Sequence, residues 1–529
     1  MNPAASDALA GPTLPRNPWP VAMAVLLATF MVVLNTSVVV VALPYVAGNL
    51  GATADEATWV MTSYLAANAI VLPASAWFAR FFGRKRFLLA CIALFTVASV
   101  ACGLATTMPA LVLARVLQGI GGGALQPLSQ SILLESFPPA KRGEAMAIFG
   151  IGTVIAPTVG PALGGWFTDM YTWRWMFYVN LPVGLLSLLL IATLVKDPPY
   201  IRAGRPKGID GLGFSLMAIW LATLQISLDR GEEVNWFAAV WLRWFLGISA
   251  VAMVAFIVRE LCAEHPIVDL RILKNRNFAV SSVISIQYGV IIFALITLQP
   301  MFVQELLGYN AYSAGLTVVP RGLGQLAALF LVGYLVERLD QRKLLAFGFV
   351  VMGFGCLLLS RMTLQMSMNS IVPANLINGF GQGFIFVPLT TLAIRNVRNE
   401  QMGNATCIYN LLRNLGGGIG LSLLSTYLVR FSQMHQAQMA GHMSPLNPVY
   451  QQRLATVQGI FATRFNSVDA QARAHAFMYQ TLQQQADYWS YMNEFYVIAW
   501  LCVVCFVGVL FFKKVPLARA AADVKASSL

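Results

Sequence analysis

Long apolar stretches, interrupted by short clusters of charged residues, are the dominant pattern of this sequence. No charged residue occurs in 17–54, in 87–114 or in 362–394. A run of about 20 apolar residues is long enough to cross a bilayer as a helix. The pattern predicts fourteen such helices, at residues 19–43, 57–79, 87–107, 109–133, 144–167, 175–195, 210–228, 238–258, 278–302, 313–336, 344–361, 369–393, 404–428 and 494–512.

The composition agrees with this pattern. Of the 529 residues, 58% are hydrophobic and only 11% are charged, whereas a soluble domain carries about 25% charged residues. We therefore expect an all-α polytopic membrane protein. The histidines form no metal-ligand spacing, and Cys502 and Cys505 form a CxxC pair inside a predicted span, where packing is its expected role. No metal or cofactor is expected.

The distribution of Lys and Arg orients the predicted helices. Basic clusters occupy alternate loops, for example FFGRKR (81–86), PPAKRGE (138–144) and RILKNRN (271–277), and a further cluster follows the last span. Loops rich in Lys and Arg stay in the cytoplasm. Both termini are therefore expected in the cytoplasm, and the net charge of +13 follows from topology, with no nucleic acid as a partner.

One connection differs from the other loops. Residues 430–490 are hydrophilic, rich in Gln, Ala, His and Met, and on this topology lie outside the cell with some helical character. Two interpretations are open: a tolerated surface insertion, or a docking surface for another protein.

Two stretches 260 residues apart repeat one another. QGIGGGALQPL (118–128) and NGFGQGFIFVPL (378–389) both carry glycine at every second position. The repeat predicts two six-helix bundles, 19–195 and 278–512, the second including the outer segment. A two-helix insert with its linkers, 196–277, separates them, between a cytoplasmic N-terminus (1–18) and tail (513–529). Two parallel halves are typical of secondary transporters, whose substrate site lies between the halves near the midplane.

The predicted fifth helix contains helix breakers in the stretch VIAPTVGPALGGW (154–166). Small residues recur every fourth position and form one stripe, which allows a second helix to approach closely in lipid. Pro157 and Pro161 each remove a backbone hydrogen bond and bend the helix. A gating or sealing role is the functional interpretation; ordinary kinked packing is the alternative. The stripe consists of Gly152, Ala156, Gly160 and Gly164.

These motifs resemble those of a known family, the fourteen-span major facilitators of the EmrB/QacA type. GPALGG (160–165), which ends at Gly165, is similar to the family's antiporter motif, and LARVLQGIGGG (113–123) is similar to its fourth-helix motif with Arg115 as the arginine. PPAKRGEAMAIFG (138–150) and YNAYSAGLTVVPRG (309–322) resemble EmrB-type exporters. Over nearly the whole chain, the resemblance implies the major facilitator fold, arranged as 6 + 2 + 6 helices.

The resemblance further implies proton-driven export of hydrophobic or amphipathic compounds across a bacterial inner membrane. It also implies a periplasmic adaptor protein and an outer-membrane channel as partners, with which the outer segment is compatible. The cytoplasmic loop motif of the family maps to Gly83, Arg84 and Lys85.

The sequence departs from the family pattern at two places. Members usually carry an aspartate in the first helix, where LNTSVVVVALP (34–44) has Asn35. The loop motif usually begins with glycine and contains an acid, whereas Ala76 and Arg80 stand at those positions here. Asparagine does not titrate, so the proton-coupling residue is an open question.

Charged residues in spans are costly and usually mark function. The proton-relay or coupling candidates are Arg115, Glu135, Asp210, Glu305 and Arg413. Snorkelling to the interface is the alternative for the arginines, which also include Arg321, and helix capping is the alternative for the acids. No Asp or Glu is predicted at the centre of a span. Polar cavity candidates are Asn35, Gln118, Gln126, Asn180, Gln287, Gln299 and Asn410.

Three functions remain in competition at this point. The first is the proton-coupled exporter, favoured by GPALGG. The second is a facilitator or an uptake symporter for a specific metabolite, which Asn35 leaves open. The third is a membrane receptor or scaffold, against which the two matched halves argue. An enzyme is not expected, because no hydrolytic triad, HExxH or paired-carboxylate arrangement is present.

Overall fold

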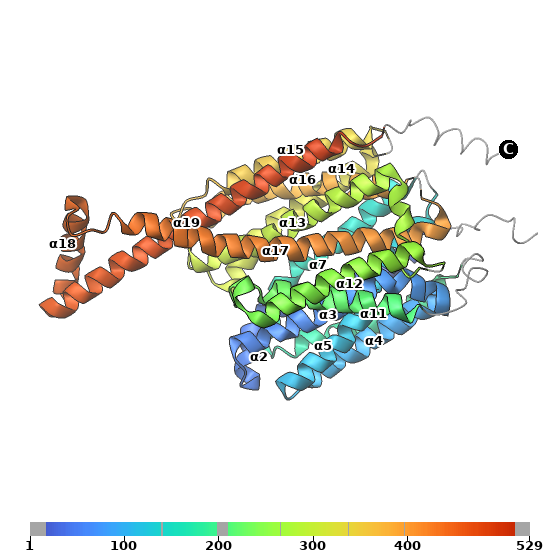
Figure 1. Ribbon diagram of the computed structural model, residues 1–529, viewed down its shortest axis with the longest axis horizontal. Helices are drawn as coiled ribbons and strands as arrows, with labels where there is room; N and C mark the ends of the chain where they lie inside the picture. The colour runs from blue at the N-terminus through green and yellow to red at the C-terminus, as the bar shows by residue number, and fades with distance from the viewer. Residues whose placement is uncertain are drawn as a thin grey trace, which may run out of the picture.

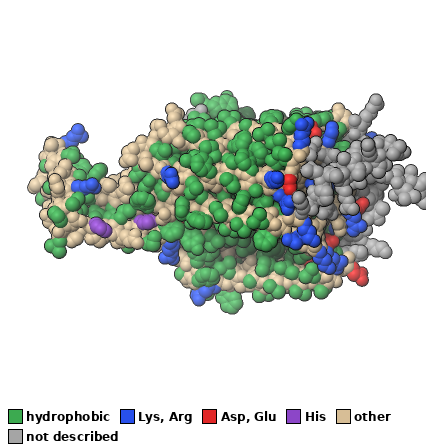
Figure 2. All heavy atoms as spheres, turned by 90° about the horizontal axis from the view of Figure 1, so that it is seen from above, with side chains coloured by type: hydrophobic (Ala, Val, Ile, Leu, Met, Phe, Trp, Pro, Cys, Tyr) green, Lys and Arg blue, Asp and Glu red, His purple; other side chains and the backbone are tan. Residues whose placement is uncertain are grey.

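The computed structural model describes residues 17–138, 141–197, 210–264, 266–336, 338–395 and 397–513. Within these ranges every regular element is a helix. The long helices run side by side along the longest axis of the molecule (Figure 1). Thirteen helical segments of the described chain are long and apolar enough to cross a membrane. Figure 2 shows a broad apolar surface over the middle of the bundle, as expected for a membrane protein.

The first helix set, α2 to α9, contains the first six predicted spans. The predicted fourth span is two helices, because the chain departs from the α-helix at Ala124 after the run Gly121–Gly123. The predicted sixth span begins with the short helix α8. The helices are α2 (Trp19–Leu50), α3 (Ala54–Phe82), α4 (Arg84–Leu104), α5 (Met108–Gly123), α6 (Leu125–Ser136), α7 (Arg142–Met170), α8 (Trp175–Tyr178) and α9 (Asn180–Leu194).

Two helices follow before the second set, α13 to α19, begins. They are α11 (Gly211–Arg230) and α12 (Val240–Cys262), which pack on each other. The second set contains the last six predicted spans. Its helices are α13 (Arg276–Glu305), α14 (Ala311–Leu335), α15 (Gln341–Leu359), α16 (Met368–Ile394), α17 (Met402–Ala440), α18 (Pro448–Ala462) and α19 (Ser467–Val509).

Helix α17 is absent from the thirteen apolar segments, although the predicted span 404–428 lies inside it. Its glycines and Arg413 lower its hydropathy, but neighbouring helices enclose it. It packs along α13, α19 and α3. Fourteen helical segments thus match the fourteen predicted ones, and α17 belongs to the bundle through packing rather than composition.

The segment 430–490 forms a projecting hairpin. Helices α17 and α19 continue beyond the bundle, and α18 packs on α19 at the tip (Figure 1). Several apolar side chains of the hairpin are exposed, among them Leu446, Ile460 and Val468. The predicted helical character is confirmed, and the continuous helices explain why the hairpin stands out as an extension of the bundle.

Lys and Arg side chains gather at the opposite end of the molecule from the hairpin (Figure 2), and we call this the basic end. The described chain both starts and stops there. Trp19 packs edge-on against Phe137 with ring centroids 5.9 Å apart, and the Lys513 N–H donates to Asn277 at the start of α13.

The glycine runs of α5 and α16 make equivalent contacts in the two helix sets, each allowing a neighbouring helix backbone to approach. The glycines of each pair are 260 residues apart in the chain, and the facing residues are 257 apart. This equivalence assigns matching positions in α3 and α14. The contacts are Gly119 with Tyr64 and Gly379 with Arg321, Gly121 with Cys91 and Gly381 with Gly348, and Gly123 with Asn68 and Gly383 with Gln325.

Candidate functional site

A fully buried arginine, Arg115 of α5, joins three helices of the first set. Its Nη1 donates to Asn35 Oδ1 of α2 and to Gln118 Oε1, each at 2.7 Å. Its Nε donates to the Val60 carbonyl of α3 at 2.8 Å. The guanidinium also lies 4.3 Å from the centroid of the Tyr64 ring. All of these partners are neutral. The positive charge of Arg115 is therefore stabilised by amide and carbonyl oxygens and by the face of the Tyr64 ring.

Three predicted residues, Asn35, Arg115 and Gln118, therefore meet in one cluster. Asn35 and Gln118 point their oxygens at the guanidinium, and their amide nitrogens have no hydrogen-bond partner in the described chain. At position 35, a carboxylate would form an ion pair with Arg115. Asparagine supplies the hydrogen bond without cancelling the charge.

The second helix set contains a related cluster around Arg321 of α14. This arginine is 4% exposed and donates to Gln299 of α13 and to Asn375 of α16. Its Nε and Nη1 atoms have no partner among the described residues. Arg321 occupies the position that matches Tyr64, and Asn375 occupies the position that matches Arg115. The two arginines thus lie on helices that do not correspond to each other: Arg115 is on α5, which matches α16, whereas Arg321 is on α14, which matches α3.

The small-residue stripe of α7 faces α2. A Cβ atom at Gly152 would lie 3.0 Å from Leu26, one at Gly160 would lie 2.6 Å from Ser37, and one at Gly164 would lie 2.9 Å from the Val38 carbonyl. Ala156 is fully buried. No atom lies within 4 Å of such a Cβ at Gly165, so this glycine lies off the stripe.

The opposite side of α7 packs on α14 of the second set. Gly322 of α14 approaches Thr158, and Gly333 approaches Ala147. α7 remains one continuous helix through Pro157, which is half-buried, and through Pro161, whose side chain lies outside the described part. Because α7 contacts both sets, it forms a joint between them.

The loop motif and Glu135 come together at the basic end. Arg84 forms a 2.6 Å ion pair with Glu135, and both side chains are less than 10% exposed. The Lys85 N–H donates to Asp197 Oδ1 at 2.8 Å, beyond the end of α9. Gly83 has φ +92°, in the left-handed region that favours glycine. This loop therefore ties α3, α4, α6 and the end of α9 together.

The other acidic candidates have separate local roles. Asp210 caps α11 by accepting from the Gly213 N–H at 3.0 Å, and it forms an ion pair with Arg259 at 3.1 Å. Glu305 lies at the hairpin end and accepts from the Tyr491 hydroxyl at 2.7 Å. The structure does not bring these two acids to the Arg115 cluster.

The remaining candidates lie on α6 and α17. Asn410 Nδ2 donates to Gln130 Oε1 at 2.6 Å, across the two helix sets. Gln126 is half-buried on α6. The Arg413 carbonyl of α17 lies against Gly289 of α13. This close approach of α17 to α13 in the second set corresponds to that of α7 to α2 in the first.

Hydrogen bonds between the two sets occur at the basic end. Ser75 Oγ and Cys407 Sγ are 3.1 Å apart, the Thr406 hydroxyl contacts the Pro127 carbonyl, and Arg142 donates to Asn399 at 2.7 Å. Together with the Asn410–Gln130 bond, these contacts close the bundle at its basic end.

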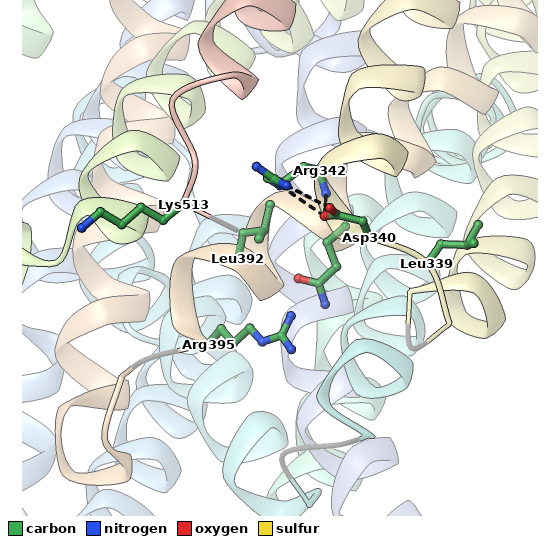
Figure 3. Close-up of a pocket in the computed structure, with 7 residues that line it drawn as sticks. Leu339, Asp340, Arg342, Leu392, Arg395 and Lys513 are labelled. Carbon is green, nitrogen blue, oxygen red and sulfur yellow. Dashed lines mark hydrogen bonds and ion pairs between the residues drawn. The ribbon is translucent and has the colours of Figure 1, made fainter. Parts of the chain in front are cut away.

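A pocket at the basic end is lined by the loop between α14 and α15, where Asp340, Gln341 and Arg342 lie 257 residues after Gly83, Arg84 and Lys85 (Figure 3). Asp340 pairs with Arg342 at 3.0 Å. Burial raises the pKa of Asp340, but hydrogen bonds from Arg342 outweigh this effect and lower the pKa below its ordinary value. Arg395 and Lys513 also line this pocket, which is therefore basic.

Sequence reasoning missed two buried acids: Glu260 of α12, which accepts from the Val268 N–H, and Glu494 of α19. Glu494 of α19 is fully buried, and neither carboxyl oxygen has a hydrogen-bond partner in the described chain. The predicted last span begins at Glu494, so the sequence places this acid at the membrane surface. The 3–4 spacing of Tyr491, Ile498, Cys502 and Cys505 was the available signal that a buried stripe begins earlier.

Comparisons with known proteins agree with this architecture. Residues 25–421 match the model of the Major Facilitator Superfamily. The chain is 35% identical over 497 residues to the multidrug export protein EmrB of Escherichia coli (strain K12), covering 93% of this chain and 95% of that protein. It is 36% identical to the fatty acid resistance protein FarB of Neisseria gonorrhoeae, covering 82% and 86%.

Among solved structures, the proton:xylose symporter XylE shares the fold, with a TM-score of 0.57 at 16% identity and coverage of 91% of this chain and 94% of that one. The helical bundle, the family match and the extent of the sequence identity lead to one conclusion: this multi-pass membrane protein belongs to the major facilitator superfamily of transporters.

Proposed function

We propose that this protein exports hydrophobic or amphipathic toxic compounds in exchange for protons. The observation that carries the proposal is the position of α7, whose glycine stripe packs on α2 while its other side packs on α14. A helix shared by two sets that meet at one end of the bundle is suited to alternating access. The names of the relatives, multidrug export and fatty acid resistance proteins, support export.

We propose that the basic end faces the cytoplasm of a bacterial cell and that the protein lies in the inner membrane. The positive-inside rule supports this orientation, which puts both termini inside and the projecting hairpin in the periplasm. Residues 19–195 and 278–512 then form the two moving halves, with 196–277 as the insert. The cycle alternates between this conformation, closed at the basic end, and one open to the cytoplasm.

The candidate residues take the following proposed roles. The α7 stripe, with Pro157, Pro161 and Gly165, seals or gates the path. Glu135, bonded to Arg84, and Asp210 act in cytoplasmic gating, and Arg115, Glu305 and Arg413 are coupling candidates. Gln126 and Asn410 contribute polar groups to the cavity.

We propose that the projecting hairpin docks a periplasmic adaptor, which connects the transporter to an outer-membrane channel. Its exposed apolar side chains, such as Leu446, which is 92% exposed, support this role over that of a tolerated insertion. Deletion of residues 443–464 is expected to abolish resistance in cells while transport in liposomes continues, because only the partner contact is lost.

The deciding experiment uses purified protein in liposomes that contain a pH dye. Ethidium, a lipophilic cation, and taurocholate, an anionic amphipath, are suitable probes because neither carries protons through lipid by itself. Proton movement that depends on the probe and opposes probe flux supports antiport. Probe flux without proton flux would instead support the facilitator, the second candidate, which the neutral Asn35 favours.

A further inference from the structure

Several acids in or next to the spans have a partner in the described chain. Glu135 bonds to Arg84, Asp229 accepts from Gln225, Glu260 accepts from the Val268 N–H, and Glu305 accepts from Tyr491. Glu494 differs, because both of its oxygens are buried and lack a hydrogen-bond partner among the described residues. An ionised carboxylate in such a place is strongly disfavoured. The arrangement therefore favours the protonated, neutral form of Glu494 in this conformation.

The position of Glu494 is inside the bilayer rather than at its surface. It lies fifteen residues before the end of α19 at Val509, a distance of about 23 Å along the helix. The hydrocarbon core is about 30 Å thick. Glu494 therefore lies within the core, near its hairpin-side boundary.

Glu494 lies on the face of α19 that packs on α17. Asp487 accepts from Ser432 of α17, and the Ser490 hydroxyl donates to the Leu428 carbonyl of α17 at 2.5 Å. Positions 487, 490 and 494 are three and four residues apart and share one helix face. Tyr491, also three residues from Glu494, bonds to Glu305 of α13, so Glu494 lies between the residues of α19 that contact α17 and those that contact α13.

The titratable and charged groups around this face have other partners or are exposed. Glu305 of α13 bonds to Tyr491, and His435 of α17 contacts Asn493 at 2.9 Å. At the hairpin end of the neighbouring elements the cations are exposed: Arg430 on α17, Arg361 after α15 and Arg453 on α18. Arg413 of α17 lies fifteen residues before Leu428, the partner of Ser490, which is about 23 Å along the helix towards the basic end. In the described chain none of them bonds to Glu494, and a proton is the simplest group that neutralises it.

We propose that Glu494 is the carboxyl that binds and releases the coupled proton, an inference that rests on the proposed exchange of substrate for protons. α17 packs beside Glu494 on α19, and it also supplies contacts between the two helix sets at the basic end, through Cys407 and Asn410. Proton occupancy and the packing of α17 on α19 stabilise each other. When α17 moves to open the basic end, water reaches Glu494 and its proton leaves.

The test compares Glu494→Gln with Asp487→Asn in liposomes with an internal pH dye. Glutamine has the shape of a neutral carboxyl, so E494Q is expected to fold and to exchange ethidium or taurocholate across the membrane within about twofold of the native rate. Probe-dependent proton movement is expected to fall about a hundredfold or more. The control D487N, which replaces an acid at the same end that already accepts from Ser432, is expected to keep proton movement.

Native proton movement in E494Q would overturn the proposal. Loss of probe exchange in E494Q, with exchange retained in D487N, would also overturn it, because the neutral isostere should be accepted in this site. Infrared spectroscopy of the purified native protein separates this proposal from the proposed function. A protonated-carboxyl stretch that E494Q lacks is expected even if no probe drives proton movement; absence of that band from the native protein overturns the assignment.

Discussion

Tyr64 of α3 and Arg321 of α14 occupy equivalent positions in the two helix sets, each with its carbonyl against a glycine of the following repeat helix. In the first set the ring of Tyr64 receives the guanidinium of Arg115. In the second set Arg321 donates to Asn375, which stands where Arg115 would be. The repeat thus preserves a buried cation at this place in each set, on α5 in the first set and on α14, the counterpart of α3, in the second.

Restoring a carboxylate beside Arg115 is expected to stabilise the protein. In the variant Asn35→Asp, the 2.7 Å contact with Arg115 Nη1 becomes an ion pair, and a hydrogen bond between charged groups contributes about 1 kcal/mol or more beyond a neutral one. Thermal unfolding in detergent should therefore shift to higher temperature.

The matched control is Asn410→Asp. Asn410 donates to two acceptors, Gln130 Oε1 and the Thr406 carbonyl, so a carboxylate there meets oxygen atoms and should lower the unfolding temperature. An unchanged or lower unfolding temperature for N35D would show that the Arg115 charge is already balanced.

A single methyl group on the α7 stripe is expected to impair export. In Gly160→Ala the new Cβ lies 2.6 Å from Ser37 Cβ, and overpacking of this kind costs about 1–3 kcal/mol. Gly48→Ala in α2 is the control, because no atom lies within 4 Å of its Cβ. Probe efflux from cells, normalised to protein in the membrane, checks both; equal efflux from the two variants would contradict a sealing role for the stripe.

Alanine at Gly83 is expected to loosen the loop of the basic end. The φ of +92° strains any residue with a side chain, and such strain costs about 1–3 kcal/mol. The unfolding temperature of Gly83→Ala should fall. Gly247→Ala in α12, where the Cβ meets no atom within 4 Å, should not lower it. A native-like unfolding temperature for G83A would mean that the loop adopts another backbone conformation at no cost.

A disulfide at the basic end is expected to hold this conformation. Ser75 Oγ and Cys407 Sγ are 3.1 Å apart, close enough for Ser75→Cys to pair with the native cysteine. Oxidation should stop probe transport in liposomes, and a reductant should restore it. The same Ser75→Cys change in a Cys407→Ser background should be insensitive to oxidation. Continued transport with the cross-link formed would mean that the Ser75–Cys407 contact persists throughout the cycle.

The sequence predicts where the membrane helices lie because polar side chains are costly in lipid, so every span must be a long apolar stretch. It predicts helix ends less well. α19 begins at Ser467 rather than near Glu494, since Ala, Gln and Arg continue a helix outside lipid as readily as apolar residues do inside it.

The Arg115 motif was recognised, but its partners were not fully predicted. Asn35 and Gln118 were separate cavity candidates, and the structure turns both toward the same guanidinium. One sequence does not specify the rotation of each helix about its axis, which decides these contacts. The burial of Glu494 could not be predicted for the same reason, because it depends on how α19 is rotated about its axis.

Helix α17 is a single rod from Met402 at the basic end to Ala440 in the projecting hairpin, about 58 Å long. When such a rod rotates about one end, its other end moves the furthest. A tilt of about 10° around its basic end displaces the far tip by about 10 Å. A protein seated on the hairpin would thus sense mechanically whether the opposite side of the membrane is shut, with no diffusing signal between the two compartments.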